Sequence, residues 1–581
     1  MEYRISQHDD RPQRAAELVH ARARYAYDAR RGFPVSSGFH DQDKPALPWQ
    51  LKTLELQERL RLNLRALKRR GKWTFVNDLQ DLSPRKLAAM MKAGDVAGII
   101  DYFMPIPGGM IPDAPAATLD DYRELFALTA LPPAVGAFES DAYFAETMVA
   151  GPDPTRLRRL DAVERKFPIT DAHLSSVPAL AGDDLTAAMA GGRVYWVDHA
   201  VMTDLSGGTH PSGPKFVYAP MVAFAVPRGG GPLRPFAIQC GQEPQDRIIY
   251  TPRDGHAWQL AKGCVSAAHN THHEVLTHLG FTHLISEAIL VSTLRNLAAS
   301  HPIAVLLRRH FEGTLSINKL AVDILIQPGR AVEYLIGSDL KTTHPWLARH
   351  RAAHSFREHY LPARLANAGV DHVTALPHHP YRDDGLLIWD AIGRWMTAFV
   401  GAYYPSDDDV RGDGELATWA QEIAAPDGGG VRDFGATPGA ICDRHDLTQI
   451  LTMILWTAGP QHAAVNFAQK DHLAFAPANP LAGFTPEPRG RMHTRADWLA
   501  SLPPLDVAVH QLCVMTFLGS VRHTTLGDYG DDFKDTPAAG GQRQFQNQLA
   551  AAEDEIQARN RRRAQPYEYL RPSLIPNSTN I

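Results

Sequence analysis

The spacing of apolar and polar residues predicts helices along most of this 581-residue chain. Between residues 10 and 100, leucines and charged residues recur at helical intervals, most clearly from Leu51 to Gly71. The Pro- and Gly-rich run from Met104 to Asp113 predicts a loop. From Trp258 onward the spacing is again helical, so the pattern as a whole predicts a mainly α fold.

Two features interrupt the helical pattern. Residues 192–240 alternate β-branched and aromatic residues between Gly and Pro turns, which predicts a small antiparallel β insert. Acidic and glycine-rich stretches at 405–415 and 426–440 predict surface loops. No internal repeat is present in the sequence. We therefore predict one large helical domain over residues 1–581, with residues 1–110 forming N-terminal helices packed on it.

The composition is that of an ordinary globular protein. Apolar residues make up 44% and charged residues 21% of the chain, and the net charge is -5, so no basic field indicates a nucleic-acid partner. The four cysteines, Cys240, Cys264, Cys442 and Cys513, form no CxxC pair. This spacing argues against a thiolate zinc site and fits a reducing compartment.

The sequence shows no targeting or membrane signal. Its first residues have no apolar signal-peptide core, and no run of about 18 apolar residues predicts a membrane span. These observations favour a cytoplasmic protein. Residues 9–33 are rich in Arg and Ala at helical spacing, which predicts a surface helix, with transient contact with a membrane surface as the alternative.

A run of histidines lies in an otherwise apolar helical segment. His273, His278 and His283 follow one another at five-residue intervals and precede His301 and His310. In an α-helix, residues five apart diverge by about 140°, so they would not face one ion. A π-bulge realigns them, and such bulges favour functional sites. One core histidine is usually a packing residue, but a helix this apolar is not expected to hold several core-facing histidines without a functional reason.

Two further parts of the chain carry candidate ligands. His462 and Asn466 are four residues apart, so they share one face of a helix. The chain ends with Pro576-Asn-Ser-Thr-Asn-Ile581, which by default would be a frayed tail. Spacing alone does not decide which two of the first three histidines would bind a metal.

Taken together, the histidine run, the string Gln461-His-Ala-Ala-Val-Asn-Phe467 and the terminal isoleucine resemble a lipoxygenase. Lipoxygenases are non-haem iron dioxygenases that peroxidise polyunsaturated fatty acids. The likeness extends to Trp258-Gln-Leu-Ala-Lys262 and to Tyr381–Asp390. It implies a large helical catalytic domain whose metal site lies between two long core helices.

The resemblance also implies a ligand set. The metal ligands would be His278, His283, His462, Asn466 through its amide oxygen, and the α-carboxylate of Ile581. His273 and Gln469 would lie beside them, Gln469 as a hydrogen-bond donor. Such ligands suit a redox-active first-row metal rather than tetrahedral zinc. Iron is the expected cofactor, and manganese would serve the same ligands.

The family reaction sets the expected activity. A ferric hydroxide takes a hydrogen atom from a bis-allylic CH2, and dioxygen then adds to the opposite face to give a conjugated hydroperoxide. No side chain is expected to act as a base beside that metal-bound hydroxide. The expected substrates are dioxygen and a fatty acid of the linoleic or arachidonic type, without an obligate protein partner.

Family positions also assign the expected substrate pocket. Ala321 falls at the stereocontrol position, where alanine accompanies S products. Leu320 replaces a basic residue that pairs with the fatty-acid carboxylate in some animal members, and Asn270 replaces a depth-setting phenylalanine. These two departures leave the substrate orientation open. The expected pocket residues are Leu279, Leu284, Ile317, Leu325, Leu335, Ile336 and Leu518.

Two alternatives keep some of these features. A fatty-acid hydroperoxide isomerase would form epoxyalcohols or allene oxides at the same iron, and a catalytically silent lipid-binding module would lack the metal.

The N-terminal β-barrel (PLAT) domain of plant and animal members needs a run of strands, whereas residues 1–150 are predicted to be helical. No such domain is therefore expected in this chain.

Overall fold

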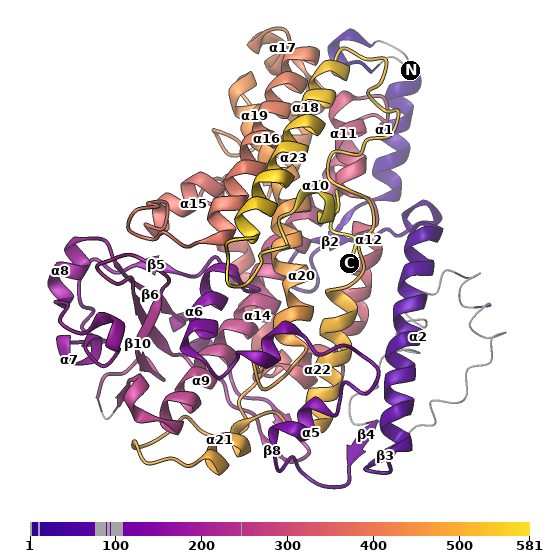
Figure 1. Ribbon diagram of the computed structural model, residues 1–581. Helices are drawn as coiled ribbons and strands as arrows, with labels where there is room; N and C mark the ends of the chain where they lie inside the picture. The colour runs from indigo at the N-terminus through magenta and orange to yellow at the C-terminus, as the bar shows by residue number, and fades with distance from the viewer. Residues whose placement is uncertain (1–2, 10–11, 76–88, 90–92, 94–108, 246) are drawn as a thin grey trace.

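The computed structural model describes residues 3–9, 12–75, 89, 93, 109–245 and 247–581 (Figure 1). Helices make up most of the fold, and a small sheet lies to one side with α7 (Asp171–Leu174) and α8 (Leu185–Ala190) beside it. The predicted mainly α fold with a small antiparallel sheet is confirmed.

One long helix runs through the core. α9 (His256–His272) continues into the π-helix η7 (His273–His283) and then into α10 (Leu284–Asn296). Among the described residues this unit, His256–Asn296, is long and apolar enough to cross a membrane, but 94% of its most apolar window is buried inside the protein. The helix contains no uninterrupted run of about 18 apolar residues, because polar and charged residues recur along it. Its burial is that of a core helix.

A second broken helix lies against the first. α19 (Arg444–Trp456) leads into the π-helix η9 (Thr457–Gln461) and α20 (His462–Leu473). α20 packs on η7 and on α22 (Leu505–Leu518), and the two π-helices also touch each other. α22 and the short α21 (Arg495–Ser501) form a bent pair that passes the same length-and-composition test only if the two are joined.

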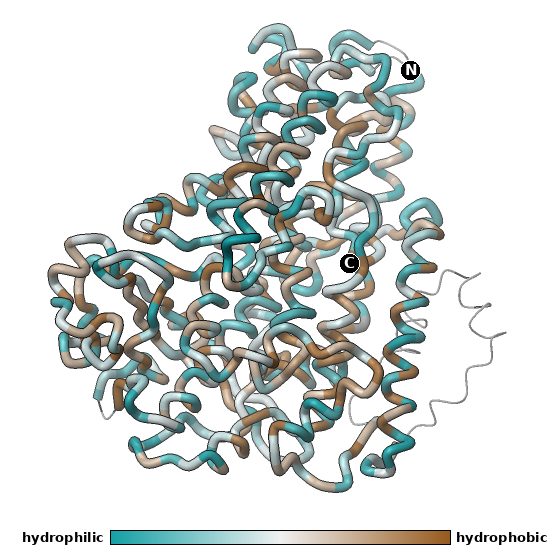
Figure 2. The backbone as a smooth tube through the Cα atoms, viewed as in Figure 1, coloured by the Kyte–Doolittle hydropathy of each residue, from teal (hydrophilic) through white to brown (hydrophobic). Residues whose placement is uncertain are grey.

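The remaining helices surround this core. Figure 2 shows hydrophobic and hydrophilic residues alternating along the peripheral α2, as an amphipathic helix requires. α16 packs on α19 and α23, and α10 packs on α1 and α18. Their bounds are α1 (Pro12–Arg24), α2 (Leu47–Arg69), α5 (Leu119–Arg123), α6 (Asp141–Ala150), α11 (Pro302–His310), α12 (Thr314–Leu320), the π-helix η8 (Ala321–Leu325), α13 (Ala331–Leu335), α14 (Leu340–Ala353), α15 (Leu361–Ala368), α16 (Pro380–Tyr403), α17 (Asp407–Gly412), α18 (Gly414–Ala424) and α23 (Ala539–Asn560).

The sheet is wider than the predicted insert. Its order is β11-β10-β9-β6-β5, with every neighbouring pair antiparallel. The two edge strands lie outside residues 192–240, and a hairpin of β7 (Thr209–His210) and β8 (Gly213–Pro214) lies inside them. The sheet strands are β5 (Arg158–Arg159), β6 (Val194–Asp198), β9 (Met221–Ala225), β10 (Arg234–Gln239) and β11 (Ile249–Tyr250).

Three local predictions need correction. Residues 405–415 are not a loop, because Ser406 and Asp413 accept hydrogen bonds at the N-termini of α17 and α18 and so start helices there. Met110–Pro112 forms a strand, β4, that pairs with β3 (Trp73–Phe75) instead of the predicted loop. The short pair β1 (Tyr27–Asp28) and β2 (Val35–Ser36) interrupts the predicted N-terminal helices.

Of the other predictions for these regions, one is confirmed and one concerns residues outside the described part of the chain. Residues 426–440 form a loop, as predicted, apart from isolated bridges. The predicted helices and loop between residues 76 and 108 fall almost entirely outside the described residues.

Candidate metal centre

The π-helix η7 turns two histidines toward each other. The Nε2 atoms of His278 and His283 lie 3.2 Å apart, although an ordinary α-helix would point residues five apart in different directions. The widened turn predicted from their spacing is therefore present.

His462 completes a cluster of three rings. It is the first residue of α20, and its ring centroid lies 4.9 Å from that of His283 and 5.8 Å from that of His278. One nitrogen from each ring falls within 4.8 Å of the others. Burial lowers the pKa of all three, that of His283 to about 3, so the rings are neutral and carry lone pairs.

The carboxyl terminus reaches this cluster. A terminal oxygen of Ile581 lies 3.1 Å from Nε2 of His462, and the residue is 1% exposed. A buried carboxylate is costly unless a positive charge or several donors stabilise it. A cluster of three neutral imidazoles, one of which contacts this carboxylate, has the donor chemistry of a divalent metal site. The residues brought together here therefore fit such a metal.

The tail that carries Ile581 is held along its length. Asn577 to Ile581 are all at most 1% exposed, so the tail is not frayed. Trp49 Nε1 donates to the Asn580 carbonyl at 2.6 Å, and Ser578 Oγ donates to the Glu312 carbonyl at 2.7 Å. A Cβ at Gly459 would lie 3.1 Å from the Pro576 carbonyl oxygen, so a glycine lets the tail pass η9 closely.

The amide of Asn466 is fixed one helical turn after His462. Its Nδ2 donates to the Leu518 carbonyl at 2.8 Å, and its Oδ1 accepts from Gln469 Nε2 at 3.0 Å. Gln469 is thus the predicted hydrogen-bond donor to this side chain. Both residues are fully buried, so the orientation of the amide oxygen is set by protein contacts.

One carboxylate and one backbone carbonyl lie behind His273 and His278. His273 places its Nε2 2.9 Å from the Val465 carbonyl and stacks on His278 with centroids 5.7 Å apart, so it lies next to the cluster without joining it. Glu274 lies 3.8 Å from Nδ1 of His278. Burial raises the pKa of Glu274, but its contacts with His273 and His278 outweigh burial and lower it to about 2.

Asn318 orients His283, a role that sequence did not indicate. Its Oδ1 lies 2.7 Å from Nδ1 of His283, and its Nδ2 donates to Glu287 at 2.8 Å. This contact fixes Nδ1 as the protonated nitrogen and leaves Nε2 free to face His278. Asn318 lies 35 residues from His283 in sequence, so no local pattern reveals the pairing.

We expect Asn318→Ala to weaken metal binding by roughly 10- to 100-fold, because His283 loses the acceptor that fixes its ring. The measurement is the metal affinity of the purified variant by competition with a chelator. Asn296→Ala is the control and should leave that affinity unchanged, because it removes a buried amide at the end of the same helical unit that bonds Ser292 and, on α18, Glu422. Equal affinities for wild type and Asn318→Ala would contradict the expectation.

A mostly aliphatic cavity opens beside the cluster. His278, His283 and Ile581 form part of its wall. Six of the seven predicted pocket residues line it, together with Ala321: Leu279, Ile317, Leu325, Leu335, Ile336 and Leu518. Leu284 does not line it, because it directly follows His283 and turns away into a buried apolar cluster, where it is 0% exposed.

A family model for lipoxygenases matches residues 134–567 of the chain. The chain belongs to the lipoxygenase family. A linoleate 9/13-lipoxygenase of Pseudomonas aeruginosa is 39% identical over 80% of this chain and 70% of its own length. A lipoxygenase crystal structure in complex with arachidonate superimposes with a TM-score of 0.85 at 27% identity, covering 100% of this chain and 84% of that one. A human hydroperoxide isomerase, ALOXE3, is 32% identical over 76% of this chain and 62% of its own.

Other polar residues of this lipoxygenase lie outside the cluster. His301 bonds Asp413 at 3.0 Å, and His310 bonds Tyr529 and the Asn577 carbonyl of the tail, both at 2.9 Å, so neither ring joins the cluster. Asn270 donates to the Pro480 carbonyl at 3.2 Å and does not line the cavity. Lys319, next to Leu320, is ion-paired with Asp323 at 2.7 Å on the surface.

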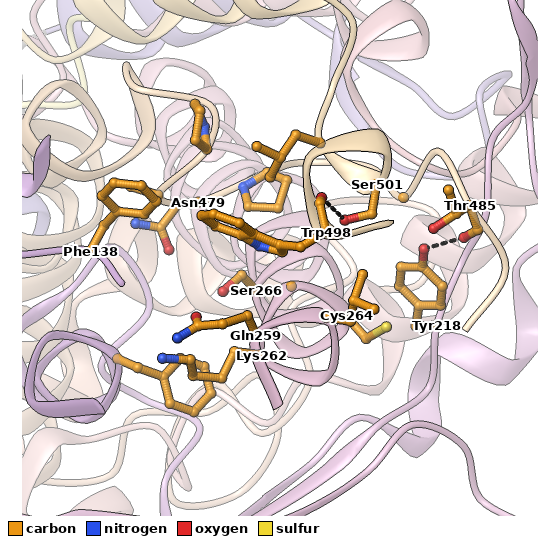
Figure 3. A pocket seen from close by; sticks show the side chains of 18 of the residues that line it. Phe138, Tyr218, Gln259, Lys262, Cys264, Ser266, Asn479, Thr485, Trp498 and Ser501 are labelled. Atoms are coloured by element: carbon orange, nitrogen blue, oxygen red, sulfur yellow. Dashed lines mark hydrogen bonds between the residues drawn. The ribbon is translucent and has the colours of Figure 1, made fainter. Parts of the chain in front are cut away.

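Figure 3 shows a second cavity, which is lined in part by Phe138, Lys262 and Trp498. Pro480 and Ala482 line it, whereas Leu481 between them lines the aliphatic cavity. In Figure 3 Tyr218 donates to the Thr485 carbonyl, at 2.5 Å, near Cys264 of α9. The segment Pro480–Ala482 therefore separates the two spaces.

Proposed function

We propose that this lipoxygenase binds iron and dioxygenates polyunsaturated fatty acids of the linoleic or arachidonic type to S hydroperoxides, acting as one catalytic unit over residues 1–581. The observation that carries the proposal is a buried carboxyl terminus that contacts His462, one of three clustered neutral histidines, at the wall of an aliphatic cavity. The linoleate specificity in the name of the bacterial relative supports the substrate class.

We assign the metal to His278, His283, His462, the amide oxygen of Asn466 and the carboxylate of Ile581. A redox-active first-row ion held there supplies one-electron chemistry at a bis-allylic carbon of the substrate. Nitrogen and oxygen donors of this kind suit iron, and manganese would also be accepted, whereas structural zinc prefers closed tetrahedral sites. Asn466 is the weakest of these donors, because its oxygen also accepts from Gln469.

The chain's own residues would position the substrate. Leucine and isoleucine side chains hold an acyl chain by burying its methylenes, at about 0.8 kcal/mol for each CH2. The same aliphatic wall excludes water from the reacting carbon. Glu274 and Asn318 hold two of the histidine rings from behind, so the ligands would need little rearrangement when the metal binds.

Ala321 tests the stereochemical part of the proposal. It begins the π-helix η8 and lines the aliphatic cavity, where its methyl group limits the space beside the acyl chain. We expect an S hydroperoxide from the wild type and a shift of oxygen toward the neighbouring R position in Ala321→Gly. Chiral chromatography of the reduced products measures both, and an R product from the wild type would contradict the expectation.

The deciding experiment follows conjugated-diene absorbance with linoleic and arachidonic acids, together with an oxygen electrode and elemental analysis. Diene formation matched by oxygen uptake in an iron-loaded protein supports the dioxygenase. A protein that purifies without metal and gains no activity when iron is supplied would refute it.

A second function has an observation in its favour, because the human relative is named a hydroperoxide isomerase. Conversion of fatty-acid hydroperoxides to epoxyalcohols or allene oxides at the same ligands would consume no dioxygen. Turnover of a linoleic acid hydroperoxide without oxygen uptake would therefore favour the isomerase.

A further inference from the structure

Few of the described residues that line the aliphatic cavity are ionisable. Its ionisable lining groups are Glu274, the ligand candidates His278 and His283, the carboxylate of Ile581, and His344. No lysine or arginine is among the described residues that line it. A fatty acid brings its own carboxylate, so the binding of the free acid raises the question of which group receives that charge.

His344 is the ionisable lining residue with no assigned role. It lies on α14, where Leu340, Thr343 and Leu347 also line the cavity, so one face of this helix forms part of the wall. Its Nε2 lies 3.0 Å from the Ile326 carbonyl, which identifies Nε2 as a donor. The Nδ1 atom has no hydrogen bond in the described part of the chain and is available to a ligand.

The Ile326 contact also gives His344 a fixed position. Ile326 directly follows the π-helix η8, whose first residue is Ala321. The imidazole therefore spans from α14 to the segment that carries the stereocontrol position. A group bound to His344 would keep a fixed position relative to Ala321, because the backbone of η8 connects Ala321 to Ile326.

We propose that His344 is the carboxylate-binding residue of this cavity and that its Nδ1–H receives the head group of a free fatty acid. The inference rests on the proposed function for its substrate class. Nε2–H would keep its bond to Ile326, so both ring nitrogens would have acceptors. An unpaired carboxylate in an aliphatic wall is strongly disfavoured, and an imidazole donor beside it would supply the missing partner.

Such a contact would select one substrate orientation. With the head group at His344, an acyl chain of given length places one bis-allylic carbon beside the histidine cluster, so free acids would give one main positional product. A fatty alcohol or methyl ester lacks the anion. It would bind less tightly and in more than one orientation.

The test compares linoleic acid with linoleyl alcohol in wild type and His344→Gln. Glutamine keeps an N–H donor for Ile326 but cannot take a positive charge. We expect His344→Gln to raise KM for the acid by roughly 10- to 100-fold, with kcat nearly unchanged and the alcohol unaffected. His344→Arg, which restores a cation, should recover most of the acid preference.

Lys319→Gln is the matched control, because it removes a basic residue that lies outside the cavity and is paired with Asp323. It should leave both KM values unchanged. Thermal melting and metal content establish that the His344 variants are folded. Equal effects of His344→Gln on acid and alcohol, or none on the acid, would overturn the assignment.

The binding step is measured separately from turnover. Calorimetric titration with linoleic acid and linoleyl alcohol under nitrogen gives both affinities without any reaction. If the wild type binds the acid more tightly and His344→Gln removes that difference, the inference stands even where oxygenation fails. If the wild type binds both equally, His344 does not hold the carboxylate, whatever the outcome of the activity assay.

Discussion

Adding one glycine after Ile581 is expected to abolish oxygenation and to lower metal affinity by at least about 100-fold. The terminal oxygen of Ile581 lies 3.1 Å from His462, and Asn577 to Ile581 are buried. An extra residue moves the carboxylate away and puts an uncharged peptide carbonyl in its place. It also needs room in a core that is already close-packed.

The tail contacts make this effect specific to the end of the chain. Trp49, Glu312 and His310 hold the Asn580 carbonyl, the Ser578 hydroxyl and the Asn577 carbonyl, so the tail does not slide to accommodate an addition. Ile581→Val, which keeps both the carboxylate and an apolar side chain, is the control and should retain metal. Iron content by elemental analysis and oxygen uptake give the readouts. A glycine-extended protein with full iron and activity would rule out the terminal carboxylate as a ligand.

Sequence was most informative where geometry followed from spacing. Two histidines five apart in an apolar helix require a widened turn to face each other, and the structure contains that turn. His462 and Asn466 share a helical face because they are four apart, as any regular helix dictates. These parts of the site depend on short-range helical geometry, which a sequence encodes directly.

Sequence was least informative where contacts join distant segments. Asn318 and His344 lie on helices whose register against the core helix depends on packing, and no local pattern indicates that they approach His283 or the cavity. For Leu284, the sequence predicted a contact with the pocket that the structure lacks. Its neighbour His283 belongs to the cluster, but one residue further along the helix the side chain points into the core.

The sheet and the helix starts show how local signals are overridden. β5 and β11 are two residues each, too short for alternation to mark them, and they form because β6 and β10 offer free edges. The acidic stretch at 405–415 contains helices because Ser406 and Asp413 satisfy the first amides of α17 and α18. Composition suggested a loop, whereas the caps decide the outcome.

Replacing His462 by glutamine is expected to remove the metal while leaving the fold in place. Its ring meets His278, His283 and the Ile581 carboxylate, so its loss breaks the link between the two core helices and the tail. Glutamine has a similar length and a weaker donor oxygen. We expect metal affinity to fall by at least about 100-fold and oxygenation to fall below detection.

His301→Gln is the matched control. His301 is an equally buried histidine, but it bonds Asp413 and is not part of the cluster. It should lower the melting temperature by a few degrees, by removing a buried bond worth about 1–3 kcal/mol, yet keep its iron. Elemental analysis with thermal melting in the presence of a chelator separates the two variants. If both lose iron equally, loss of metal reports general destabilisation. If His462→Gln alone loses it, the metal is held by the ring of His462 in the core.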